Sequence, residues 1–116
     1  MIICFSAENK NIDSILSSRF ENGKYFIFID DQNKVMEVVL NKIKDKGTVY
    51  LVAEKRPDLV ITGNITPNSF DFLQASGIKI ASGIFGISVR EAFKRYAKGK
   101  IKEAKEIPGA GRGRIL

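Results

Sequence analysis

The stretch PDLVITGNITPNSF, residues 57–70, decides the fold of this chain. Its apolar run Leu59–Ile61 predicts a short strand that leads into Thr62-Gly63-Asn64. Thr66 is a favourable N-cap, and Pro67 suits the first position of a helix, where no N–H is needed. The stretch is therefore a strand–turn–helix unit of an α/β fold. Because ligands of open α/β sheets bind beyond the carboxyl ends of the strands, the turn marks a candidate binding site.

The rest of the sequence extends this unit in both directions. Apolar runs predict strands at 2–6, 25–29, 34–40, 59–62 and 78–81, and helical spacing predicts helices at 48–55, 67–76 and from Ser88 onward. Ser88 and Glu91 have the spacing of a capping box. We expect a turn at residues 30–33 and a long loop without structure at 7–24. The order β-β-β-α-β-α-β-α predicts a three-layer α/β fold, a mixed five-stranded sheet with helices on both faces.

Length and composition indicate one α/β domain at residues 1–101, followed by a basic, Gly/Arg-rich and flexible tail at 102–116. No apolar run is long enough to span a membrane. The single cysteine rules out an intramolecular disulfide and suits a reducing compartment, so we expect a cytoplasmic protein.

The positive charge is confined to the last fifth of the chain. Residues 1–93 contain 11 basic and 11 acidic side chains, whereas residues 94–116 contain 8 basic side chains against Glu103 and Glu106. A basic arm of this kind can bind nucleic acid. A solvated helix face with a soluble tail is the simpler interpretation, and the only aromatic residue in the arm is Tyr96, which disfavours base stacking.

The chain has no histidine, which excludes His-based general base catalysis, Ser and Cys triads and nearly every zinc site. Asp30 and Asp31 are placed together in a hairpin turn, whereas two-metal nucleases need carboxylates from several elements. We therefore expect a binding protein and not an enzyme.

The candidate ligand-binding residues belong to loops that should meet at one edge of the sheet. Helices are predicted to begin near Thr48, Thr66 and Ser88, and helix N-termini favour anions. Arg19 offers a planar charged fork, or else a surface ion pair. Gly63 and Asn64 permit close approach to a ligand, or else only form a tight turn. The cofactor-binding candidates are Ser6, Ser17, Arg19, Gly63, Asn64, Pro67, Asn68 and Gly83.

Cys4 is the one candidate metal ligand. It lies in the middle of the first predicted strand, and free cysteines are among the most buried residues, so a place in the core is the favoured interpretation. One thiolate could bind a preassembled cluster at a single iron but could not hold a four-cysteine cluster.

Four stretches together resemble a known family: the first strand with Ser17-Ser18-Arg19-Phe20 and Tyr25-Phe26, then residues 57–68, Gly77–Ile80, and Gly86–Ala92 with Tyr96 and Lys98–Lys100. The chain is similar to the dinitrogenase iron–molybdenum cofactor biosynthesis family. This resemblance implies a ribonuclease H-like fold and a non-catalytic carrier for an iron–sulfur or iron–molybdenum type cluster, with cofactor-assembly proteins as partners. Many family members have His in place of Arg19 and Gly in place of Glu21.

Three functions remain open from the sequence. The first is metallocluster binding, and the second is metal-free binding of a small anion or metabolite. The third and least favoured is a nucleic-acid accessory role for residues 94–114.

Overall fold

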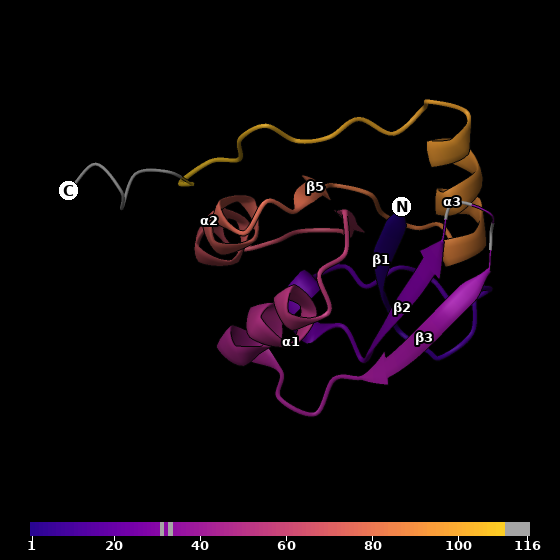
Figure 1. Ribbon diagram of the computed structural model, residues 1–116, viewed down its shortest axis with the longest axis horizontal. Helices are drawn as coiled ribbons and strands as arrows, with labels where there is room; N and C mark the ends of the chain where they lie inside the picture. Colours follow the sequence, from indigo (N-terminus) through magenta and orange to yellow (C-terminus); the bar gives the residue numbers. More distant parts are fainter. Residues whose placement is uncertain (31, 33, 111–116) are drawn as a thin grey trace.

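The computed structural model describes residues 1–30, 32 and 34–110. The five strands are β1 (Ile2–Ala7), β2 (Tyr25–Asp30), β3 (Val35–Leu40), β4 (Leu59–Ile61) and β5 (Lys79–Ala81). They form one sheet in the order β3-β2-β1-β4-β5 (Figure 1). β2 is antiparallel to β1 and β3, whereas β4 and β5 run parallel to β1. The predicted mixed five-stranded sheet is confirmed.

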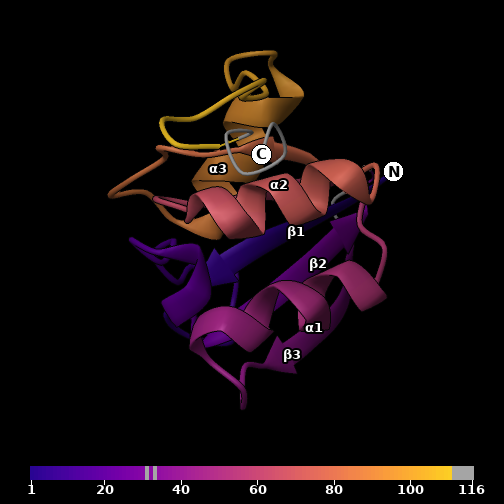
Figure 2. The ribbon, with the colours of Figure 1, turned by 90° about the vertical axis from the view of Figure 1, so that its left-hand side faces the viewer.

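Three helices cover the sheet from both sides: α1 (Thr48–Glu54), α2 (Pro67–Ala75) and α3 (Val89–Ala97). α1 and α2 lie next to each other on one face, and α3 lies on the other (Figures 1 and 2). Alternate side chains of the central strand β1 point to opposite faces of the sheet, as strand geometry requires. Phe5 packs with Phe93 of α3, whereas Cys4 lies in the core under α1 and α2. The predicted three-layer architecture is therefore confirmed.

The N-caps of the two longer helices follow the sequence signals. The Thr66 side chain accepts a hydrogen bond from the Ser69 N–H (3.3 Å), and Ser88 Oγ accepts one from the Glu91 N–H (3.0 Å). Only half of the predicted capping box forms, however. The Glu91 carboxylate instead accepts from Arg95 Nε, one turn further on (3.0 Å), where the pair is exposed.

The prediction of an unstructured loop at 7–24 is wrong. A 3-10 turn, η1, spans Phe20–Asn22, and bridges in the β conformation join Ala7 to Leu16, Ile15 to Ser88 and Arg19 to Asn64. The loop has little regular secondary structure of its own, but it pairs with elements that lie far away in the chain. Backbone hydrogen bonds from Leu16, Ser17 and Phe20 to Ile87, Ser6 and Asn64 hold the loop in place.

The predicted turn at 30–33 lies partly outside the described residues, because Asp31 and Asn33 are not described. Asp30 Oδ1 accepts hydrogen bonds from the N–H groups of Gln32 (3.0 Å) and Lys34 (2.9 Å). This arrangement explains why an Asp at the end of β2 reverses the chain.

The segment after α3 crosses the outer edge of the sheet and reaches α2 (Figure 1). The Ala104 N–H donates to the Ile80 carbonyl of β5 (2.7 Å), and Gln74 of α2 donates to the Lys105 carbonyl (3.0 Å). Ile107 and Ala110 pack partly buried against the core. The rest of the predicted flexible tail, residues 111–116, lies outside the described residues. In the described part of the chain, no helix has the length and apolar character to cross a membrane.

Candidate functional site

Three loops meet at the edge of the sheet where the parallel strands end. They are residues 17–19, which follow β1, residues 62–64, which follow β4, and residues 82–86, which follow β5. We call these segments the edge loops. Parallel strands bring their carboxyl ends to one edge, so the topology alone assembles this cluster.

Gly63 is the point where the edge loops touch. A β-carbon at this position would lie 2.5 Å from the Ser18 carbonyl oxygen, 2.8 Å from the Ser17 carbonyl oxygen and 2.8 Å from the Phe85 ring. The Asn64 N–H donates to the Ser18 carbonyl (2.8 Å), and the Gly83 N–H donates to the Gly63 carbonyl (2.8 Å). The glycine is therefore required by close packing of the three loops.

Two buried serines lie beneath the edge loops. Ser6 Oγ and Thr62 Oγ1 are 2.7 Å apart and form a buried hydrogen bond between β1 and the end of β4. The Ser17 N–H donates to the Ser6 carbonyl (2.9 Å), which fixes the first loop on the strand. Ser17 Oγ is buried and has no hydrogen-bond partner among the described residues. Ser6 and Ser17 thus lie together, inside the protein and not on its surface.

Arg19 is exposed on the same edge. Its backbone pairs with Asn64, but its guanidinium forms no ion pair with any described residue. Gly83 and Gly86 are exposed with φ of +79° and +74°, and no atom of the described chain would crowd a β-carbon at either. No oxygen in the described part of the chain accepts from the N–H groups of Phe85 and Gly86. A free cation and free backbone donors therefore flank Gly63.

The N-terminus of α2 is already occupied by a carboxylate of the protein. Glu21 Oε2 accepts from the Thr66 N–H (3.2 Å) and from Thr66 Oγ1 (2.9 Å). A negative charge at this position is favoured by the helix dipole. Asn68 is exposed and Pro67 half-buried, with Gly109 of the C-terminal segment beside the proline ring. An external anion would have to compete with Glu21 here, which makes Pro67 and Asn68 the weaker part of the predicted site.

Cys4 is fully buried in the middle of β1, between Phe28 of β2 and Val60 of β4. Burial raises the pKa of the Cys4 thiol well above its usual range, because the thiolate would lose its solvation. The thiol thus offers no surface to a ligand. No group of three or more Cys, Asp or Glu side chains able to hold a metal ion occurs among the described residues.

The structure therefore groups the predicted site residues in three places. Ser6, Ser17, Arg19, Gly63, Asn64 and Gly83 lie at the edge loops, Pro67 and Asn68 lie at the start of α2, and Cys4 lies in the core. Sequence reasoning missed Thr62 and Glu21. The spacing of Thr62 after β4 could have indicated its contact with Ser6, but nothing local to Glu21 indicates its burial.

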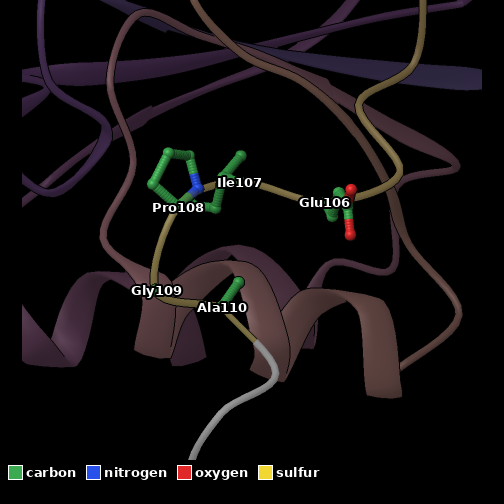
Figure 3. A pocket seen from close by; sticks show the side chains of 5 residues that line it. All are labelled: Glu106, Ile107, Pro108, Gly109 and Ala110. Carbon is green, nitrogen blue, oxygen red and sulfur yellow. The ribbon is translucent and has the colours of Figure 1, made fainter.

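A hollow of about 440 Å³ lies in the C-terminal segment and is lined by residues 106–110 (Figure 3). Its only charged lining residue is Glu106, and none of the predicted site residues lines it. The edge loops therefore remain the site that fold and chemistry favour.

The fold is that of a small α/β domain whose edge loops lie beyond the carboxyl ends of its parallel strands. The sequence pattern of the dinitrogenase iron-molybdenum cofactor family matches residues 1–99, and the chain belongs to that family.

Solved structures agree with this assignment. The apo form of the orange protein from Desulfovibrio gigas is 27% identical, with a TM-score of 0.81, over 90% of this chain and 92% of that one. A putative NifB protein from Thermotoga is 28% identical, with a TM-score of 0.80, over 95% and 98%. A putative dinitrogenase from Methanocaldococcus jannaschii is 22% identical, with a TM-score of 0.67, over 92% and 97%, and shows the fold alone. No curated protein sequence matches the chain.

Proposed function

We propose that this protein is a non-enzymatic carrier that binds an anionic metallocluster of the iron–sulfur or iron–molybdenum type at the edge loops. The observation that carries the proposal is Arg19, an exposed arginine that has no ion-pair partner among the described residues and whose backbone pairs with Asn64, next to Gly63. Membership of the iron-molybdenum cofactor family over residues 1–99 supports the kind of ligand.

The chemistry of the edge loops suits a cluster that keeps its own ligands. The chain has no histidine and its one thiol is buried, so the protein has little to offer as a direct metal ligand. The sulfurs of a cluster accept hydrogen bonds, and such bonds tune clusters in other proteins. Arg19 and the free N–H groups of Phe85 and Gly86 supply the required positive charge and donors.

A carrier of this kind accepts a cluster from one protein and releases it to another, so cofactor-assembly proteins are the expected partners. If the protein contacts only the outside of the cluster, without a covalent metal–protein bond, the cluster is released more readily. A reducing compartment such as the cytoplasm would protect both the cluster and the free thiol.

A second candidate is a metal-free module that binds a small anion or metabolite at the same loops. The burial of Cys4 favours it, because no thiolate is then needed. The same Arg19 and N–H groups would bind phosphate or a carboxylate.

The test is iron retention under anaerobic conditions. The full chain is mixed with a preformed, anionic four-iron cluster, desalted, and analysed for iron per chain. We expect about four iron atoms per chain in the wild type and in Cys4→Ala. We expect most of this iron to be lost in Arg19→Gln. Alanine is used at position 4 because serine would bury a hydroxyl group.

The matched control is Arg56→Gln, which removes an exposed arginine just before β4, at the opposite edge of the sheet. Equal loss of iron in Arg19→Gln and Arg56→Gln would show attraction to net charge only. No iron in the wild type, together with phosphate binding that depends on Arg19, would favour the metal-free candidate.

A further inference from the structure

A cleft separate from the edge loops opens between α1 and α2. It has a volume of about 440 Å³, within the range of sites for small molecules. One wall is formed by α1 with Val49 and Tyr50, and the other by α2 with Asn68, Ser69 and Phe72. Glu21, Thr66 and residues 45 and 46 complete the lining.

Glu21 is the unusual member of this lining, because it is a carboxylate that is only 3% exposed. Glu side chains are almost never fully buried without partners. Oε2 has two donors, the N–H and the hydroxyl of Thr66. Oε1 is buried and has no donor among the described residues. A buried carboxylate oxygen without a donor is costly, and a bound ligand with an N–H group would remove that cost.

The position of Glu21 is held from behind by a buried polar network. Thr48 Oγ1, at the start of α1, donates to the Glu21 carbonyl (3.1 Å). Asn41 Nδ2 donates to Thr48 Oγ1 (3.1 Å) and to the Gly23 carbonyl (2.9 Å). The 3-10 turn that bears Glu21 is thus tied to Asn41, which follows β3, and to α1, so its backbone is held in place before any ligand binds.

An aromatic pair forms part of the lining of the cleft. The rings of Tyr50 and Phe72 meet edge to face, with centroids 4.9 Å apart and an interplanar angle of 76°. They are 59% and 38% exposed, respectively, which is high for large side chains that touch each other. A flat, apolar ligand would cover these rings and gain from their removal from water.

The charge of the lining favours a cationic ligand. Glu21 and Asp45 contribute two carboxylates, against the single ammonium of Lys46. This preference is opposite to that of the edge loops, where Arg19 is the free charge. Residues 19 and 21 therefore serve two surfaces that differ in the sign of the ligand they attract.

We propose that the cleft between α1 and α2 binds a small aromatic molecule that carries a cationic N–H donor, of the amidine or amino-heterocycle class. The N–H group bonds to the Glu21 carboxylate, and the ring lies against Tyr50 and Phe72. This site is independent of the anion site proposed at the edge loops.

The test uses benzamidine as the probe and benzoate as its anionic counterpart of the same shape. Backbone amide signals of the full chain are followed by NMR during titration with each compound. Benzamidine is expected to shift the signals of Glu21, Tyr50, Thr66 and Ser69, whereas benzoate is expected to leave them unchanged. Glu21→Gln keeps an acceptor for Thr66 but places an NH₂ group where the unpartnered oxygen was. We expect this change to weaken benzamidine binding at least about tenfold.

Two further variants keep the result interpretable. Tyr50→Ala removes an exposed ring from α1 and is expected to weaken benzamidine binding even if Glu21→Gln does not fold. Glu54→Gln makes the same chemical change at an exposed position of α1 outside the cleft lining and is expected to leave binding unchanged. Absence of benzamidine shifts, equal shifts with benzoate, or undiminished binding in both Glu21→Gln and Tyr50→Ala would overturn the proposal.

Discussion

Glu21 and Thr66 are 45 residues apart in the chain, yet the Glu21 carboxylate lies 2.9 Å from Thr66 Oγ1 and 3.2 Å from the Thr66 N–H. Thr66 in turn caps α2 through the Ser69 N–H. The loop that contains Glu21 is thereby fixed to the start of α2, the helix that follows β4. Both residues line the cleft between α1 and α2, and each comes two residues after one of the edge loops.

Replacing Thr66 should test this contact directly. Thr66→Val removes both the cap of α2 and a donor to a buried carboxylate, so we expect the free energy of unfolding to fall by about 2 kcal/mol. Thr66→Ser retains the hydroxyl group and is expected to lose less than half as much. Urea unfolding of the two variants beside the wild type measures the difference. Equal losses would mean that the methyl group matters as much as the hydroxyl, and a Thr66→Val variant as stable as the wild type would show that the hydroxyl contacts contribute nothing.

Gly63 should not accept even one extra carbon. In Gly63→Ala the new methyl group would meet the Ser17 and Ser18 carbonyls and the Phe85 ring, and the backbone atoms cannot move aside cheaply. We expect a loss of about 2 kcal/mol in the free energy of unfolding, as for other overpacked sites. Asn64→Ala, at the exposed next residue, is expected to change stability by less than about 0.5 kcal/mol. A Gly63→Ala variant as stable as the wild type would disprove the packing role of this glycine.

Cys4 should be unreactive in the native protein. The thiol is fully buried and its pKa is raised by that burial, whereas only the thiolate reacts with alkylating agents. Iodoacetamide is expected to modify Cys4 at a rate set by opening of the core, and rapidly in concentrated urea. Mass spectrometry over time follows the reaction. Fast alkylation of the native protein would show that β1 presents the thiol to ligands after all.

The exposed ion pair between Asp13 and Arg90 should lower the pKa of Asp13, which a titration can measure. Arg90 Nε lies 2.9 Å from Asp13 Oδ1, and the hydrogen bond and charge of Arg90 hold the pKa of Asp13 below its usual value of about 3.9. The contribution of the pair to stability is therefore present above that usual value and is lost as the pH falls through the lower, folded-state pKa. In Arg90→Gln, the pKa of Asp13 measured by NMR titration should be close to the usual value. An unchanged pKa in that variant would mean that the pair does not persist in solution.

The sequence predicted most of the architecture because local signals and topology agree. Continuous apolar runs identify the strands, and Thr66, Pro67 and Ser88 identify the starts of two helices. The order of the elements then leaves few topologies, since crossovers between parallel strands are right-handed. The strand–turn–helix unit at 57–70 is confirmed in each of its parts.

The site was harder to predict because its decisive contacts join distant segments. Pairing of Arg19 with Asn64 gives order to a loop that has no periodic pattern of its own. Glu21 resembles a surface residue in the sequence, and it is buried only because Thr66 and the Asn41–Thr48 network surround it. Glu91 bonds to Arg95 in preference to completing the capping box, a competition between neighbours that spacing alone does not decide.

The central claim is that an anionic metallocluster is held at the edge loops, and paramagnetic broadening tests it most directly. A reduced iron–sulfur cluster is added anaerobically to the ¹⁵N-labelled full chain, and the loss of each backbone amide signal is recorded. The account predicts that signals of residues 17–19, 63–64 and 82–86 disappear first and that Arg19→Gln prevents their loss. Broadening centred on α3 and residues 98–110, or spread evenly over the chain, would contradict it.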